Sequence, residues 1–210
     1  RIHGVTHSAA FHSDDGVVEF LGVTQQVENA ELSNAPHPFV YCGSIGPLQD
    51  ARVEGFRHLL TAVAKLLVSK CHLRGIFGID FIPDSNGTPW ILEVNPRYTA
   101  SVEIIELACQ QSFLAGFQGS KGQKRTSLAP SFLAKQILYA ENSLIAPAFD
   151  VSAGPQWEWI LPTIADVPVP GTHIDATWPI CSVMATGATH EACLQSLREQ
   201  AKNVRNRLTE

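Results

Sequence analysis

The sequence has few charged residues, few aromatic residues and no long apolar run. Charged residues make up 17% of its 210 positions and aromatic residues 8%, and the formal net charge is -5. A nucleic-acid-binding domain usually carries a basic patch, and the sequence shows none. No segment approaches the ~20 apolar residues of a membrane span, and no signal peptide is recognisable. We therefore expect a protein that binds neither nucleic acid nor membranes.

The cysteines are also few and form no recognisable pattern. The chain has five, Cys42, Cys71, Cys109, Cys181 and Cys193, and no two of them form a C-x-x-C pair. An odd, scattered set of this kind is typical of reduced thiols in a cytoplasmic protein. Hydrophobic residues make up 45% of the chain, which is the balance of a globular protein with a substantial core.

The order of patterns along the chain predicts two regions. The expected elements are a hairpin over 5–26 with an Asp15-Gly16 turn, a helix over 49–70, a hairpin over 75–95, a helix from about Ser101 and a last helix from about Thr189. Residues 118–131 are rich in Gly, Ser and Lys and read as a linker. The predicted domains are therefore 1–117 and a smaller extension over 132–210.

The second hairpin places two carboxylates among apolar residues. Alternation along a strand puts Phe77, Ile79 and Phe81 on one face and Asp80 on the other. On the partner strand, the same alternation places Trp90, Leu92 and Val94 on one face and Glu93 on the other. If Asn86-Gly87 forms a two-residue turn, Asp80 lies directly opposite Glu93 and Gly78 opposite Asn95.

Like charges directly opposite each other destabilise a strand pair. Three arrangements would relieve the repulsion: a bridging cation, protonation of one acid, or a neighbouring Lys or Arg. A plainer alternative is that both acids are ordinary surface residues. That alternative leaves the neighbouring apolar residues and the "EVNPR" stretch unexplained.

Asn95 and Arg97 follow Glu93 closely and favour the cation. Carboxylate and amide oxygens suit Mg²⁺, which usually also takes water and substrate phosphate. An Arg beside such an ion can hold a phosphate or carboxylate through two hydrogen bonds. The residues alone thus indicate a magnesium–phosphate site on a stiff hairpin.

The stretch "GIDFIPDSNGTPWILEVNPRYTASVE" resembles the metal-binding hairpin of ATP-grasp enzymes, in the branch of biotin carboxylase and carbamoyl phosphate synthetase. That family shows an acid followed by Phe on one strand, then a turn, then E-x-N-x-R. The resemblance implies that Asp80, Glu93 and Asn95 bind the magnesium ions of ATP and that Arg97 faces the reacting phosphoryl group. Ser101 and Glu103 become candidates for substrate binding, although Glu103 lies further from Arg97 than in the family pattern.

The resemblance also implies a fold. It predicts an α+β ATP-grasp C-terminal subdomain, an antiparallel sheet with helices on one face, plus a small mixed α/β extension similar to that of uncharacterised carboligase-like ATP-grasp proteins. The lysines and the Gly-rich loop of the family's other half are not evident, and no Lys precedes Gly43. We therefore expect this chain to be the C-terminal half of a larger enzyme and to be inactive alone.

The implied activity is an ATP-dependent carboxylate–amine (or thiol) ligase that works through an acyl-phosphate. Its cofactors would be ATP with Mg²⁺, or Mn²⁺ in its place, and its partners a small-molecule carboxylate and amine, with a homodimer allowed. Two alternatives remain open. One is a biotin carboxylase-like carboligase that works through carboxyphosphate, and the other is a non-catalytic ATP-grasp-derived binding module.

Overall fold

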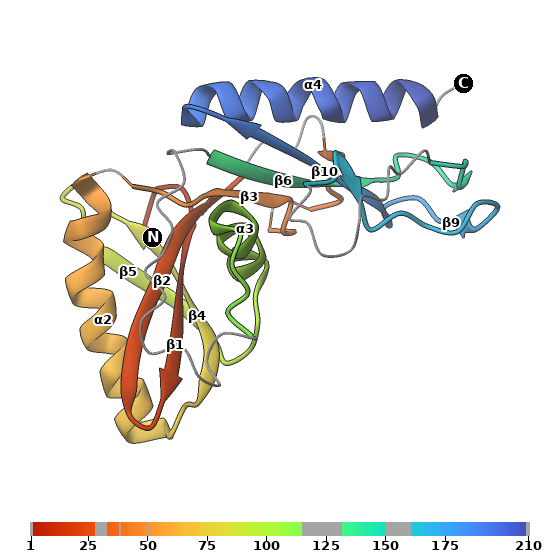
Figure 1. The fold of residues 1–210 in the computed structure, drawn as a ribbon. Coiled ribbons are helices and arrows are strands. Elements are labelled where there is room, and N and C mark those ends of the chain that lie inside the picture. Colours follow the sequence, from red (N-terminus) through yellow and green to blue (C-terminus); the bar gives the residue numbers. More distant parts are fainter. Residues whose placement is uncertain are drawn as a thin grey trace.

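The structure, a computed structural model, describes residues 2–27, 33–37, 39–49, 51–114, 132–149 and 161–208. One large antiparallel sheet dominates the described part, with strands in the order β5-β4-β1-β2-β3-β6-β10-β8 (Figure 1). A two-stranded sheet pairs β7 with β9. In chain order the elements are β1 (His7–Asp14), β2 (Val17–Gln26), β3 (Gly43–Gly46), α2 (Ala51–Cys71), β4 (Gly75–Pro83), β5 (Pro89–Asn95), α3 (Ala100–Cys109), β6 (Phe132–Tyr139), β7 (Leu144–Ile145), β8 (Ile164–Ala165), β9 (His173–Ile174), β10 (Pro179–Gly187) and α4 (His190–Leu208).

The sheet runs without interruption from the first predicted region into the second. The short strand β3 pairs with β2 on one side and with β6 on the other, so that Ser44 lies between Gln26 and Lys135. Strands from both sides of the predicted linker therefore share one sheet. The linker itself, residues 118–131, lies outside the described residues, and the domain boundaries stay a prediction.

Helices cover both faces of the sheet, which corrects the expectation of helices on one face. Figure 1 shows α2 and α3 on opposite sides of β1, β2 and β4. On one face, α2 packs on Phe11, Ile79 and Phe81, and α4 packs on β6 and β10. On the other face, Val102 and Ile105 of α3 pack on β1 and β2. The α+β class with a large antiparallel sheet is confirmed.

The long helix forms where the apolar spacing predicts it. Its core-facing residues recur every three or four positions, as an amphipathic helix requires; they are Val53, Phe56, Leu60, Ala64 and Val68. Leu59 and Leu66, which also recur at helical spacing in the sequence, are exposed. The apolar stripe is therefore narrower than the sequence suggests.

Two predicted element ends are confirmed in detail. Asp15 and Gly16 both adopt positive φ values, as the tight turn between β1 and β2 requires. Thr189 caps α4, because its side-chain oxygen accepts a hydrogen bond from the Ala192 amide at 3.1 Å.

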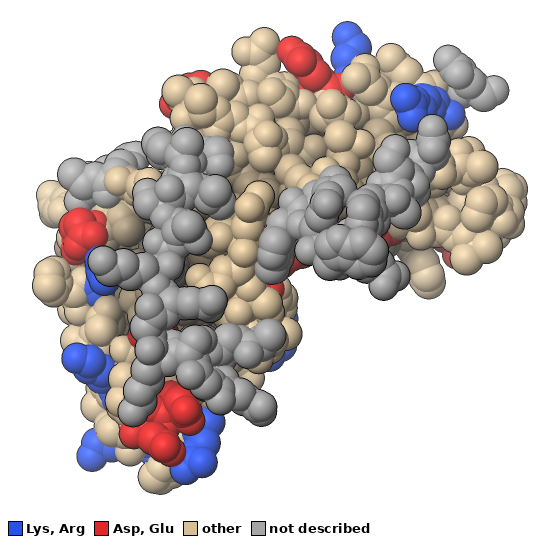
Figure 2. All heavy atoms as spheres, viewed as in Figure 1, with Lys and Arg blue, Asp and Glu red and all other residues tan. Residues whose placement is uncertain are grey.

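Among the described residues, no helix is both long and apolar enough to cross a membrane. On the face seen in Figure 2, the charged side chains of the described chain lie in small separate groups between uncharged residues.

Candidate functional site

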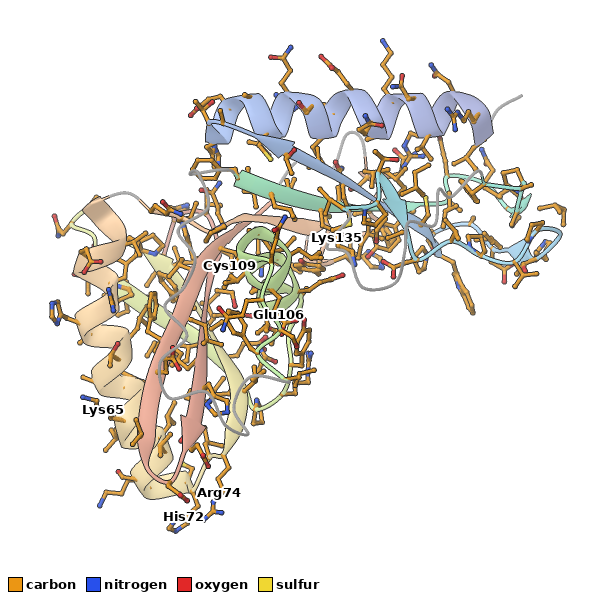
Figure 3. All side chains as sticks on the ribbon, viewed as in Figure 1. Lys65, His72, Arg74, Glu106, Cys109 and Lys135 are labelled. Carbon is orange, nitrogen blue, oxygen red and sulfur yellow. The ribbon has the colours of Figure 1, made fainter. Side chains whose placement is uncertain are left out.

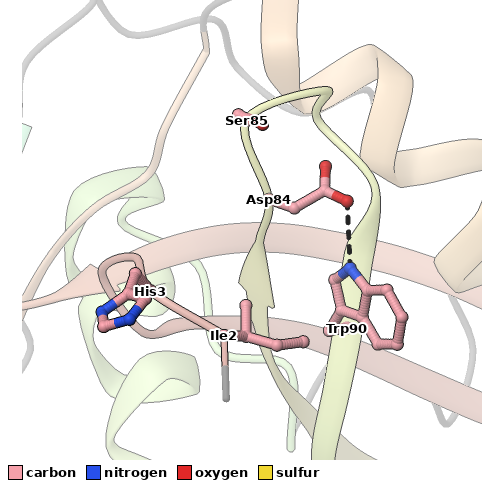
Figure 4. A pocket seen from close by; sticks show the side chains of 5 residues that line it. All are labelled: Ile2, His3, Asp84, Ser85 and Trp90. Atoms are coloured by element: carbon pink, nitrogen blue, oxygen red, sulfur yellow. Dashed lines mark hydrogen bonds between the residues drawn. The ribbon is translucent and has the colours of Figure 1, made fainter.

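The β4–β5 hairpin turns on Asp84 rather than on the predicted two-residue turn. The Asp84 carboxylate accepts hydrogen bonds from the amides of Asn86 and Thr88 and from the Trp90 indole, at 2.8, 2.9 and 3.0 Å. Gly87, with φ of 80°, closes a loop of three residues. These bonds lower the pKa of Asp84, with the Trp90 bond contributing most. Figure 4 shows the Asp84–Trp90 bond beside a depression of about 610 Å³ that Ile2 and His3 also line.

A β-bulge at Leu92 restores the predicted register beyond the turn. Near the turn Phe81 pairs with Ile91, but Asp80 pairs with Glu93, so Leu92 is the extra residue. The predicted pairing of the two acids, and of Gly78 with Asn95, is confirmed. The predicted second apolar group is wrong. Its members Trp90 and Leu92 are exposed, and only Val94 packs against the core on the α2 face.

The Asn95 side chain bridges the two acids. Its amide nitrogen Nδ2 donates hydrogen bonds to Asp80 Oδ2 at 3.3 Å and to Glu93 Oε1 at 2.8 Å. The amide thus occupies the place between the carboxylates that a cation would take. Rotation of the amide by about half a turn would direct its oxygen there instead. Asp80 is half-buried and Glu93 is exposed.

The environment of Asp80 disfavours its charge. Burial raises the pKa of the Asp80 carboxyl most strongly, and the neighbouring Glu93 raises it further. The Ser8 hydroxyl and the Arg97 charge oppose this rise without cancelling it. The charge of Asp80 is therefore only partly compensated by its neighbours, and a bound cation would compensate it further.

Polar residues extend from the acid pair across the sheet toward α3. Glu93, Asp80, Ser8 and Thr24 stand in one row over four adjacent strands. The buried Thr24 hydroxyl then donates to Ser101 Oγ in the first turn of α3, at 2.9 Å. The row therefore links the candidate metal site to the start of the helix.

Arg97 lies near the acid pair, just before α3, whereas Ser101 lies at the far end of the polar row, in the first turn of α3. Arg97 is exposed, donates to the Tyr98 carbonyl at 3.2 Å and lies close enough to lower the pKa of Asp80. The helix begins at Ala100, one residue before the position near Ser101 at which the sequence predicts its start. Thr99 is the cap residue, although its side chain makes no capping hydrogen bond, and Ser101 is buried within the helix.

Glu103 is held by a lysine that the sequence analysis missed. Lys135 on β6 (Figure 3) forms ion pairs with Glu103 at 2.9 Å and with Asp166 at 3.0 Å. Burial lowers the pKa of Lys135, but the two carboxylates outweigh it, so the pKa is raised. Ser182 donates to Asp166 at 2.6 Å. A single Lys inside the apolar strand "FLAKQILY" was the signal that could have identified this network, since buried lysines are almost always paired.

Further polar groups line the same side of the sheet. The hydroxyls of Tyr41 and Ser44 share a hydrogen bond of 2.9 Å. Burial raises the pKa of Tyr41 to about 12, with smaller contributions from Glu103 and Asp80. A depression of about 540 Å³ runs past Asp80 and Glu93 and is also lined by Gln26, His37, Phe39 and Leu92. The site thus combines two acids with an open, partly apolar cavity.

The donor set fits Mg²⁺. Two carboxylates and one amide oxygen are hard ligands, and Mg²⁺ commonly uses one or two carboxylates together with water and substrate phosphate. Within the described ranges, no group of three or more His, Cys, Asp or Glu side chains is arranged to hold a metal on its own. The roles assigned to Asp80, Glu93 and Asn95 therefore stay a prediction.

Comparisons with known proteins agree with this geometry. The family model of the ATP-grasp domain matches residues 1–101. An uncharacterized protein of Methanocaldococcus jannaschii is 29% identical over 119 residues, which cover 57% of this chain and 28% of that protein.

Two solved structures share the fold. An L-amino acid ligase from Bacillus licheniformis superposes with a TM-score of 0.68 at 17% identity, over 96% of this chain and 53% of that one. The biotin carboxylase domain of the Hydrogenobacter thermophilus 2-oxoglutarate carboxylase, in complex with MgADP and bicarbonate, gives 0.65 at 14% identity, over 93% of this chain and 44% of that one. The chain spans about half the length of these structures and less of the archaeal relative.

Proposed function

Because residues 1–101 of this chain belong to the ATP-grasp domain family, we propose that it forms part of an ATP-dependent ligase. Asp80, Glu93 and Asn95 hold the magnesium ion of ATP in this proposal. The observation that carries it is the pairing of Asp80 with Glu93, with the Asn95 amide between them. Neither a surface role nor a salt bridge accounts for two facing acids whose shared partner is a neutral amide.

The proposed reaction joins a carboxylate to an amine or thiol. A carboxylate oxygen attacks the γ-phosphorus of ATP, the bond to ADP breaks, and an acyl-phosphate forms. The nucleophile then attacks the acyl carbon, phosphate leaves, and the nucleophile loses a proton. Mg²⁺, when bound, supplies neutralisation of phosphate charge. Catalysis of this kind depends mainly on positioning and electrostatics.

The chain's own residues divide the remaining work. The Arg97 guanidinium is exposed beside the acid pair and in this proposal holds the transferring phosphoryl group. Ser101 and Glu103 form the side of the site toward the substrate. Their hydrogen bonds to Thr24 and Lys135 fix the orientation of both side chains. A rigid arrangement of this kind can place a carboxylate for attack.

Calorimetric titration of Mg·ATP tests the metal-site assignment. We expect the wild-type chain to bind Mg·ATP and a double variant, Asp80→Asn with Glu93→Gln, to bind it at least tenfold more weakly. Glu54→Gln, which removes an exposed acid on α2, is the matched control and should leave the affinity unchanged. Equal affinity of the wild type and the double variant would refute the proposal.

The products of turnover separate the remaining alternatives. Since the family's lysines and Gly-rich loop are not evident in this sequence, we expect turnover only in a polypeptide that supplies them. In that protein, ADP release that requires a carboxylate and an amine, with trapping of the acyl-phosphate by hydroxylamine, supports the ligase. Bicarbonate-dependent ADP release without an amine would favour the carboligase. Binding without any turnover would favour a binding module.

A further inference from the structure

A buried serine next to the acid pair has a hydroxyl without a well-aligned hydrogen bond. Ser8 on β1 is 3% exposed, and its Oγ has no hydrogen-bond partner among the described residues. Burying a hydroxyl without a partner costs free energy that alanine at the same place would not cost. The serine therefore invites an explanation in terms of the site rather than of the fold.

Ser8 stands directly beside Asp80. The two residues are opposite each other on β1 and β4, and Thr24 lies opposite Ser8 on the other side. Residues opposite each other on adjacent strands project from the same face of the sheet, so the Ser8 hydroxyl lies beside the Asp80 carboxylate although the two do not form a well-aligned hydrogen bond. Thr24 gives its own hydroxyl hydrogen to Ser101, which leaves the Ser8 hydroxyl free to turn toward the acid.

A glycine lies next to the Ser8 hydroxyl. A Cβ added at Gly78 would lie 3.7 Å from Ser8 Oγ and 3.1 Å from the Thr99 methyl carbon. Gly78 is also the residue opposite Asn95. A side chain at this position would press on Thr99 at the start of α3 and would come into van der Waals contact with the Ser8 hydroxyl.

We propose that Ser8 is a positioning residue that orients the Asp80 carboxylate for metal binding; this inference rests on the proposed function. A carboxylate that coordinates a metal ion through one lone pair keeps other lone pairs as hydrogen-bond acceptors. A serine O–H can donate to one of them. In this proposal, the bond from Ser8 to Asp80 satisfies the serine hydroxyl in the metal-bound protein. The serine thus lowers the stability of the metal-free protein and raises the affinity for the metal ion.

Manganese binding tests this role without any need for turnover. Mn²⁺ alone is titrated into the full chain, and free Mn²⁺ is counted by electron paramagnetic resonance. We expect Ser8→Ala to weaken Mn²⁺ binding by roughly 10–100-fold, as loss of a partner that orients a metal ligand does. Asp80→Asn serves as the reference for loss of the ligand itself.

The matched control is a second buried serine on the same strand. Ser13 is 2% exposed, its Oγ also has no partner among the described residues, and it lies about 16 Å along β1 at ~3.3 Å per residue. We expect Ser13→Ala to leave Mn²⁺ affinity unchanged. Both serine variants should raise the melting temperature of the metal-free chain, because each removes an unsatisfied buried hydroxyl, and this shows that they fold.

The outcomes separate the two proposals. If Asp80→Asn weakens Mn²⁺ binding and Ser8→Ala does not, the role of Ser8 is refuted while the metal site stands. If Ser8→Ala and Ser13→Ala weaken binding equally, the effect is structural and the inference also fails. If wild-type binding does not depend on Asp80, the metal site itself is refuted.

Discussion

Asp80 and Glu93 face each other across two antiparallel strands, and the Asn95 amide nitrogen donates to both carboxylates at 3.3 and 2.8 Å. A neutral amide can relieve only part of the repulsion between two charged acids. The pKa of Asp80 accordingly lies above its ordinary value, through burial first and Glu93 second. Protons and metal ions should therefore compete for the same place.

The first prediction concerns stability and pH in the absence of metal. Since the folded chain binds a proton on Asp80 more tightly than the unfolded chain does, this carboxyl makes the fold less stable as pH rises from its ordinary pKa through the raised one. Melting temperatures measured with a chelator should fall through this window in the wild type relative to Asp80→Asn. Parallel curves for the two proteins would contradict the prediction.

The second prediction concerns Lys135. Lys135→Met leaves Glu103 and Asp166 without their shared cation. Breaking a fully buried pair in this way costs about 3–5 kcal/mol, but Glu103 and Asp166 are partly exposed, so we expect about 2 kcal/mol in the free energy of unfolding by urea. Arg57→Met, which breaks the exposed pair with Glu54 and removes the guanidinium from the Phe20 ring, should cost about 1 kcal/mol or less. Equal losses would show that the Lys135 network is not special.

The third prediction concerns two adjacent leucines on α2. Leu60 is fully buried against the sheet, whereas Leu59 is 46% exposed. Leu60→Ala should lower the free energy of unfolding by about 2–5 kcal/mol, because it removes buried methyl groups and leaves a cavity. Leu59→Ala, the same chemical change one residue earlier, should cost less than about 1 kcal/mol. Chemical denaturation of both variants measures the difference, and similar losses would mean that α2 packs on a different face.

The fourth prediction concerns the turn. The lowered pKa of Asp84 means that the stability from its bonds is present above the ordinary carboxyl pKa and is lost as pH falls through the lowered value. The Trp90 fluorescence, taken as the difference between wild type and Trp90→Phe, should change in that acid range. The same difference measured in an Asp84→Asn background should stay constant. A transition that persists there would assign the effect to another group.

The pairing of Asp80 with Glu93 was predictable from local sequence, but the turn and the bulge that produce this pairing were not. Strand alternation and Asn86-Gly87 gave the correct pairing of Asp80 with Glu93 through a two-residue turn that does not form. The Asp84 side chain selects a longer loop, and the bulge at Leu92 compensates for the extra residue. Side-chain hydrogen bonds and bulges of this kind leave little trace in apolar periodicity.

The surroundings of Glu103 were not predictable, because they depend on contacts between distant segments. Lys135 lies 32 residues beyond Glu103, and the pair forms only because β6 joins the sheet beside β3 and carries the lysine over α3. The sequence pattern likewise identified α3 as a helix with an apolar face but contained no information on which side of the sheet it would pack. Burial of a lone lysine in a strand was the available clue.

The bulge at Leu92 divides the hairpin into two parts with different strand registers. Between Gly87 and Ile91 the strands follow the spacing set by the Asp84 loop, and from Glu93 onward they follow the spacing that the acids need. A change of one residue in the loop can therefore be absorbed at Leu92 before it reaches Glu93. Leu92, which is unpaired at the bulge, also lines the depression beside Glu93. The residue that shifts the register therefore adds apolar surface next to the two acids.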